Sequence, residues 1–276
     1  MRRFRAAAAA ALVLVAVACT TQPEAAKPVA ATATTTAVTT TTTTTPPTAV
    51  PGPGGTTIPV FQHPYEYGTP QAVVPPSSDG LLPVVRRVET DKPYVFITID
   101  DGAVRLPEAL ELIKSSGVEP TLFLNTKYVD GNVDFFKSLK DKAHARVHSH
   151  THSHPDLTTL GAAGQRDEIC GNADYLATQF GTRPSLFRPP FGNYDQNTRR
   201  VAAECGFHAL VLWTAAVNDG VVQFQAGGKL NPGDIVLMHF RQTFVQDWLA
   251  FLNRARQDGL TPVVLDDFLS PTAPRA

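Results

Sequence analysis

From about residue 92 onward, apolar positions follow two alternating spacings. Short runs of β-branched and aromatic residues predict strands buried on both faces, and the clearest is Tyr94–Ile99. Between these runs, apolar residues recur every three or four positions, which predicts amphipathic helices. The predicted strands are 94–99, 121–124, 145–147, 186–187, 208–212, 235–238 and 262–265. The predicted helices are 106–116, 133–142, 160–180, 195–205 and 247–257.

This regular alternation of strands and helices predicts parallel strands with the helices outside them. About seven such units favour a barrel over an open sheet. The expected fold class is therefore α/β, a distorted (β/α)7-type barrel over residues 92–270, with a short tail at 271–276. In such barrels, catalytic side chains lie at the C-terminal ends of the strands.

Three segments are expected to precede this domain. A cationic start followed by a short apolar run predicts a signal segment at residues 1–18, too short to span a bilayer. Residues 19–57 include a tract in which 12 of the 18 residues from 31 to 48 are Thr, and Pro and Gly follow. This composition has little to bury and predicts a disordered Thr/Pro-rich linker. Residues 58–91 are Pro-rich and predict an irregular lead-in.

Two kinds of processing fit the end of the signal segment. An ordinary signal peptidase could cut after Ala18. Alternatively, residues 15–19 resemble a bacterial lipobox, which would make Cys19 the lipidated first residue, although Ala16 stands where Leu is usual. We favour the lipoprotein because a lone Cys at the cleavage point is otherwise unexplained. Either cleavage predicts an extracytoplasmic protein, with membrane contact only through an anchor at Cys19.

Composition narrows the functional class. Hydrophobic residues make up 43% of the chain, which is enough for a substantial core. The 24 basic and 25 acidic residues give a net charge of -1, so a basic nucleic-acid-binding surface is not expected. Cys170 and Cys205 fall on consecutive predicted helices, where either a disulfide or two buried thiols would fit.

Titratable and metal-binding side chains follow the predicted strands. They are Asp100 and Asp101, then His148, His150, His152 and His154, then Arg188, Asp219 and His239. Two imidazoles and one carboxylate leave coordination positions open, which is typical of a catalytic metal site. Alone, the His tract also fits a surface stretch that binds stray metal, and Asp-Asp-Gly fits a simple turn. Their convergence on strand ends favours the catalytic site.

Four sequence motifs occur in a characteristic order. They are Thr-Ile-Asp-Asp-Gly at 98–102, His-Thr-His-Ser-His-Pro at 150–155, Arg-Pro-Pro-Phe-Gly at 188–192 and Leu-Met-His at 237–239. In this order they resemble the motifs of the polysaccharide deacetylases (carbohydrate esterase family 4, the chitooligosaccharide deacetylase homology domain). The resemblance covers residues 92–270. It implies a distorted (β/α) barrel and metal-dependent removal of acetyl groups from polysaccharides.

The resemblance also implies a role for each matching residue. Asp101, His150 and His154 would hold a divalent metal, most commonly Zn²⁺, while His148 and His152 receive no ligand role. The implied catalytic roles are Asp100 as general base, Arg188 as its orienting partner, His239 as general acid and Asp219 as the residue that tunes this acid. The backbone N–H of Phe191 would help to bind the oxyanion, and Leu237 and Trp213 would contact the substrate.

The chain departs from the family pattern beside the expected cleft. Gly220 follows Asp219 where the family commonly has a Trp that lines the substrate cleft, and Phe191 stands where Tyr is common. The expected activity is removal of acetyl groups from an N-acetylglucosamine-type polysaccharide, peptidoglycan or chitin-like, by a metal-activated water. Two alternatives stay open: an O-acetyl xylan or glycan esterase that uses the same residues, and a non-catalytic zinc-binding lipoprotein.

Overall fold

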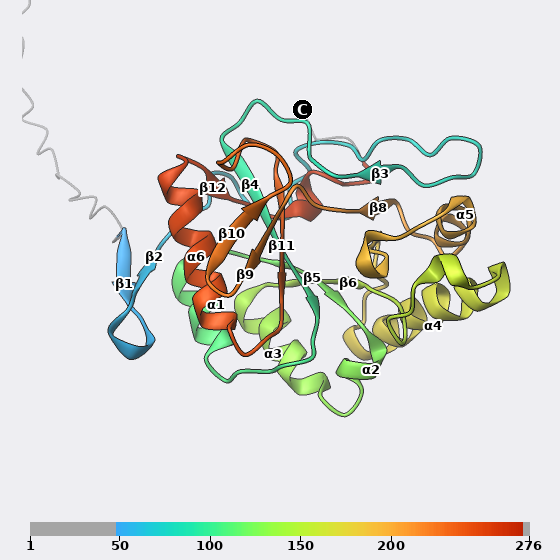
Figure 1. Cartoon of the computed structure of the whole chain (residues 1–276), viewed down its shortest axis with the longest axis horizontal. Coiled ribbons are helices and arrows are strands. Elements are labelled where there is room, and N and C mark those ends of the chain that lie inside the picture. The colour runs from blue at the N-terminus through green and yellow to red at the C-terminus, as the bar shows by residue number, and fades with distance from the viewer. Residues whose placement is uncertain (1–47, 273–276) are drawn as a thin grey trace, which may run out of the picture. The chain divides into compact units, whose positions relative to one another are not determined.

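The computed structural model describes residues 48–272 (Figure 1). The predicted signal segment, Cys19 and most of the predicted linker lie outside the described residues. Among the helices that are described, none combines the length and the apolar character needed to cross a membrane.

A curled, mainly parallel β-sheet forms the centre of the described domain (Figure 1), which confirms the predicted α/β barrel class. The strands lie in the order β10-β9-β11-β4-β5-β6-β7-β8-β3, and β12 pairs with β4. Their bounds are β3 Val84–Val85, β4 Tyr94–Asp101, β5 Thr121–Leu124, β6 Arg146–Ser149, β7 Leu186–Phe187, β8 Ala209–Val211, β9 Ala215–Asn218, β10 Val221–Phe224, β11 Ile235–His239 and β12 Thr261–Pro262. A β-bridge between Arg87 and Asp234 draws the β3 edge toward β11, so the sheet curls without forming a continuous ring of named strands.

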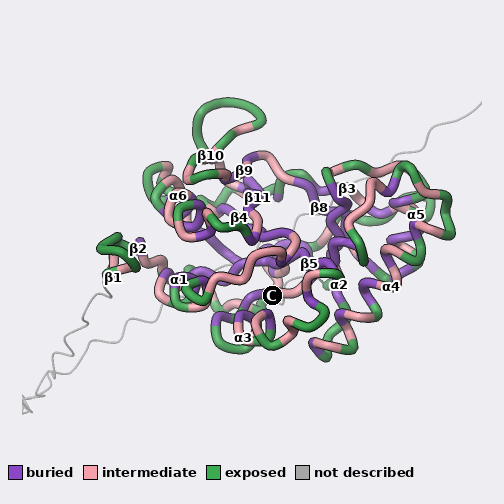
Figure 2. The backbone as a smooth tube through the Cα atoms, turned by 60° about the horizontal axis from the view of Figure 1, so that its bottom comes forward, coloured by how far each residue is buried: buried purple, intermediate pink, exposed green. Residues whose placement is uncertain are grey.

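Helices cover the outer face of this sheet. They are α1 Ala109–Ser116, α2 Thr126–Val129, α3 Val133–Ala143, α4 Ala162–Phe180, α5 Gln196–Glu204 and α6 Phe244–Gln257. Along β4, Ile97 and Ile99 pack in the same apolar cluster as Trp248 of α6, whereas Phe96 joins a second cluster with Phe123. Strand β4 is thus buried on both faces (Figure 2), as its apolar run predicts. Each such side chain contributes about 1.5–3 kcal/mol when fully buried.

Two differences from the predicted elements have local causes. Helix α1 begins at Ala109 instead of Leu106, because the residue before Pro107 is disfavoured in helical geometry. The β9–β10 hairpin was not predicted. Its two central residues, Asp219 and Gly220, have φ angles of 52° and 75°, which are the positive values that an Asp-Gly type I′ turn requires.

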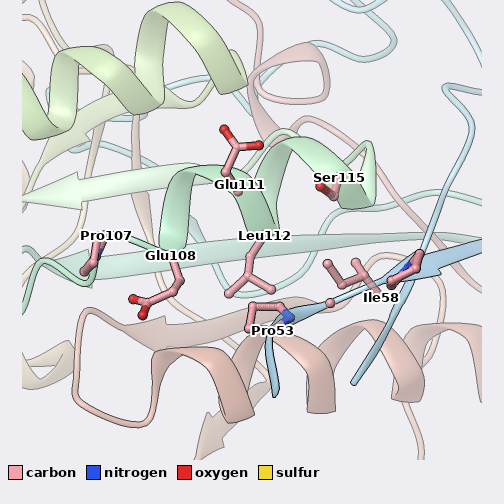
Figure 3. Close-up of a pocket in the computed structure, with 9 residues that line it drawn as sticks. Pro53, Ile58, Pro107, Glu108, Glu111, Leu112 and Ser115 are labelled. Atoms are coloured by element: carbon pink, nitrogen blue, oxygen red, sulfur yellow. The ribbon is translucent and has the colours of Figure 1, made fainter. Parts of the chain in front are cut away.

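The segment before the barrel is more ordered than its composition predicts. A short hairpin of β1 (Ala49–Pro51) and β2 (Thr57–Pro59) falls at the end of the predicted linker, and β3 lies within the predicted lead-in. Ile58 is buried, and with Pro53 and Leu112 of α1 it lines a cavity of about 430 Å³ between the hairpin and the helix (Figure 3). Apolar contacts therefore anchor this hairpin on the domain.

A disulfide joins α4 to the end of α5. Cys170 and Cys205 are bonded, with their Cα atoms 5.2 Å apart and 35 residues between them in sequence. We expect the double substitution Cys170→Ser, Cys205→Ser to lower the free energy of unfolding by about 2–5 kcal/mol, because the unfolded chain regains the freedom that the loop constrained. Urea denaturation with and without a reducing agent measures this. Equal midpoints for the oxidised and the substituted protein would contradict it.

Asp267 makes the folded domain less stable as the pH rises, whereas most carboxylates in folded proteins have the opposite effect. It accepts hydrogen bonds from the backbone N–H of Gly68 in the lead-in, and burial raises its pKa to about 6. Unfolded Asp titrates near pH ~3.9, so between these values the folded state binds more protons and loses stability as the pH rises. We expect the free energy of unfolding of Asp267→Asn, measured relative to that of wild type, to be about 2 kcal/mol higher at pH 7 than at pH 4. Urea titrations at both pH values test this, and a constant difference would refute it.

Candidate active site

The carboxyl ends of neighbouring strands meet at one cavity of about 340 Å³. The parallel register places His239 beside Asp100 and Asp101 beside Leu124. The cavity is lined by Asp100, Asp101, His150, His154, Pro189, Phe191, Trp213, Leu237, His239 and Arg241. Of the residues expected at the site, Arg188 lies directly behind this lining, and only Asp219 lies elsewhere.

Three side chains form a group that could hold a metal ion. Asp101, His150 and His154 each offer one ligand atom, and these atoms lie within 4.8 Å of one another. Oδ1 of Asp101 is buried and has no hydrogen-bond partner among the described residues. A buried carboxylate oxygen without a partner is costly, and a cation would satisfy it. One carboxylate and two imidazoles suit a divalent ion such as Zn²⁺.

The second nitrogen of His150 fixes its orientation. Nδ1 donates a hydrogen bond of 2.6 Å to the backbone carbonyl of Arg188, which leaves Nε2 unprotonated, 3.7 Å from Oδ1 of Asp101. Burial lowers the pKa of His150 to about 3, so the imidazole is neutral at pH 7. Nε2 of His154 lies 3.4 Å from the same oxygen. The imidazole of His150 is therefore already in the tautomer that a metal requires.

Asp100 is paired with a fully buried arginine. Nη1 of Arg188 donates to Oδ1 of Asp100 at 2.7 Å and to the hydroxyl of Thr98 at 2.8 Å. Nε and Nη2 of Arg188 donate to the backbone carbonyls of Val211 and Leu212. Burial raises the pKa of Asp100, and the Arg188 charge opposes this rise. The result is a carboxylate held in one orientation, with Oδ2 facing the metal group.

His239 is the last residue of β11, and one of its two ring nitrogens makes no hydrogen bond within residues 48–272. Its Nδ1 is buried and has no hydrogen-bond partner in the described part of the chain. Burial lowers the pKa of His239 to about 4; the charge of Asp100 raises it, and that of Arg241 lowers it further. Asp219, which was expected to tune this acid, accepts no hydrogen bond from His239 and is exposed at the tip of the β9–β10 turn. The turn geometry, which needs a residue with positive φ there, accounts for this position.

Several non-glycine residues of the site have left-handed backbones. The φ angles are 75° at Asp101, 73° at Thr151, 66° at His154 and 62° at Phe191. Such conformations are costly, especially for a β-branched residue such as Thr151, and persist only where surrounding contacts enforce them. Asp101, His154 and Phe191 line the cavity, and such a concentration of strained residues is typical of a functional site.

The side-chain amides of two buried asparagines hold residues 150–154, here called the histidine loop, in this strained form. Nδ2 of Asn125 donates to the backbone carbonyls of His150 and Thr151. Asn172 of α4 donates to the carbonyl of Leu124 and the hydroxyl of Ser149, and so ties β5 and β6 to the helix. Sequence reasoning missed both residues, because nothing local marks an Asn whose partners lie 23 to 48 residues away.

The other two histidines of the tract lie outside the group. Nδ1 of His148 accepts a hydrogen bond from the backbone N–H of Leu186, and its Nε2 pairs with Asp266 at 2.7 Å. His152 is exposed. Neither residue lines the cavity, so the structure separates these two histidines from His150 and His154.

Comparison with known proteins matches residues 87–210 to the family model described as polysaccharide deacetylase. This stretch of the chain is similar to the polysaccharide deacetylases. The matched residues include Asp100, Asp101, His150, His154 and Arg188, whereas His239 lies beyond them.

Individual proteins are similar to part of the chain. An uncharacterized protein of Streptomyces coelicolor is 45% identical over 158 residues, which cover 56% of this chain and 63% of that protein. The peptidoglycan-N-acetylglucosamine deacetylase of Bacillus cereus is 27% identical, over 54% of this chain and 56% of its own length. The solved family 4 carbohydrate esterase from Streptomyces lividans, in complex with acetate, is 27% identical with a TM-score of 0.56, covering 66% of this chain and 96% of that one. The chain thus spans less than two thirds of the length of the relatives from Streptomyces coelicolor and Bacillus cereus.

Metal binding can test whether Asn125 holds the histidine loop in place. We expect Asn125→Ala to weaken Zn²⁺ binding by about 10- to 100-fold, because the carbonyls of the histidine loop lose their donor. Competition with a fluorescent chelator measures the affinity. Asn197→Ala, at an exposed position of α5, is the matched control and should leave it unchanged. Equal affinities in the two variants would show that Asn125 does not order the ligands.

Proposed function

We propose that this protein is an extracytoplasmic, metal-dependent hydrolase that removes acetyl groups from an N-acetylglucosamine-type polysaccharide. The observation that carries the proposal is the shared cavity of Asp100, Asp101, His150, His154 and His239. It brings a candidate metal site within reach of one carboxylate and one imidazole that can move protons. Similarity to the polysaccharide deacetylases supports the reaction class, and the relative named as a peptidoglycan deacetylase supports a cell-wall glycan.

Asp101, His150 and His154 would hold the metal. A bound divalent ion such as Zn²⁺ would lower the pKa of a water toward about 7 and polarise the acetyl carbonyl. Asp100 is the proposed base: Oδ1 is engaged by Arg188, while Oδ2 lies 3.5 Å from Nε2 of His150 and faces the place of attack. Its raised pKa makes it a better proton acceptor than an exposed carboxylate.

His239 is the proposed acid for the departing amine. It lies on the strand next to Asp100, whose charge favours its protonated form; burial lowers its pKa to about 4, so that the protonated form is scarce at pH 7 but a strong donor. The backbone N–H of Phe191, at the cavity wall, would donate to the oxyanion, a contact worth about 3 kcal/mol in other hydrolases. Trp213 and Leu237 would contact the sugar.

Location outside the cytoplasm is proposed on two grounds. The bonded Cys170–Cys205 pair is typical of an oxidising compartment. The cationic and apolar start of the sequence is typical of a signal segment, with Cys19 as a candidate lipid anchor.

Acetate release from a panel of substrates, with and without chelator, tests the proposal. The panel contains N-acetylglucosamine oligomers, peptidoglycan fragments and O-acetylated xylan. We expect Asp100→Asn to lower kcat/KM by about 10²–10⁴-fold while Zn²⁺ stays bound, since Asp100 acts on protons and is not a proposed ligand. The matched control is Asp134→Asn, at an exposed position in the first turn of α3.

The outcomes separate the alternatives. Release from xylan alone would make the protein an O-acetyl esterase. Zinc binding without acetate release from any substrate would favour the non-catalytic lipoprotein. Activity that survives both the chelator and Asp100→Asn would refute the proposed mechanism.

A further inference from the structure

One cationic side chain at the candidate active site has no role in the proposed chemistry. Arg241 follows β11 by two residues, is exposed, and lines the same cavity as Asp100 and His239. Between residues 48 and 272, no carboxylate oxygen lies within ion-pair distance of its guanidinium. The other arginine at the site, Arg188, is buried and neutralised by Asp100. Arg241 is therefore the unneutralised guanidinium of this cavity.

The guanidinium of Arg241 is held in place by the β9–β10 hairpin. Nη1 donates a hydrogen bond of 2.7 Å to Oδ1 of Asn218, and Nδ2 of Asn218 donates in turn to Oε1 of Gln223 at 3.1 Å. A free Arg side chain loses about 2 kcal/mol of rotamer entropy when a ligand immobilises it. The contact with Asn218 reduces that loss and leaves other N–H groups of the fork available.

A positive charge at this position works against the rest of the site. It opposes binding of a cation in the same cavity, and it lowers the pKa of His239. A neutral sugar would gain only an ordinary hydrogen bond from it, which a Gln or Asn would supply without the repulsion. A substrate with an anionic group next to its acetyl group would gain a charge-assisted contact, which the guanidinium fork allows to be bidentate.

We propose that Arg241 is a specificity-determining residue that binds a carboxylate carried by the substrate close to its acetyl group. The preferred substrate is then an acidic glycan, such as a peptidoglycan strand whose sugars carry ether-linked lactyl carboxylates, over a neutral chitin-like one. This inference rests on the proposed function for its reaction. It can still be tested by binding alone.

The test uses two oligosaccharides of equal length. One is a neutral N-acetylglucosamine tetramer, and the other carries lactyl carboxylates on alternate sugars. We expect Arg241→Gln to lower the ratio of kcat/KM for the acidic oligomer to kcat/KM for the neutral one by about 10- to 100-fold. Arg241→Lys should keep part of the preference, because it keeps the charge but not the fork. Arg200→Gln, exposed on α5, is the matched control.

Binding to the chelator-treated protein, measured by calorimetry, gives a readout without turnover. The acidic oligomer should bind more tightly to wild type than to Arg241→Gln, and the difference should shrink as salt rises. If the oligomers are hydrolysed but Arg241→Gln affects both equally, the inference fails and the proposed function stands. If neither is hydrolysed yet the binding difference persists, the function fails and the inference stands. No binding of the acidic oligomer would overturn the inference.

Discussion

The buried ion pair between Arg188 and Asp100 is the interaction on which the candidate active site depends. The guanidinium has no exposed surface, and its N–H groups are donated to Asp100, Thr98 and two backbone carbonyls. The backbone carbonyl of the same residue accepts the hydrogen bond from Nδ1 of His150. Arg188 thus orients the proposed base with its side chain and a proposed metal ligand with its main chain. Removing one partner of such a pair typically costs about 3–5 kcal/mol, because the other charge stays buried.

The barrel supplies the constraint that makes this arrangement possible. Parallel strands end on the same side, so β4, β6 and β11 bring Asp100, His150 and His239 to one cavity, and Arg188 after β7 lies behind its lining. Helix α4 and Asn125 then hold the connection after β6 in backbone conformations that it would not adopt alone. The strain is local, while the contacts that oppose it come from distant parts of the chain. This division is typical of pre-organised sites.

Much of the fold could be predicted from the sequence, because its signals are local. Apolar runs placed the strands β4 and β5, and the rule that barrel chemistry lies at strand ends brought together the carboxylates and histidines. The β9–β10 hairpin was missed, although Asp219-Gly220 between apolar stretches is a turn signal; the family resemblance had assigned Asp219 a different role. Arg241 and Asn125 could not be found in this way, since their importance lies in partners distant in sequence.

The proposed acid differs most from what the resemblance implies. Nδ1 of His239 has no carboxylate partner among the described residues, and the nearby cation is Arg241. Both features keep the imidazole neutral, so the negative charge of Asp100 on the neighbouring strand is what favours its protonated form. Because the two groups interact, their protons are coupled. When Asp100 accepts a proton, that favourable charge disappears and protonated His239 becomes a stronger acid. His239 would therefore have to take up its proton while Asp100 is still charged, and proton transfer to Asp100 would then strengthen it as an acid.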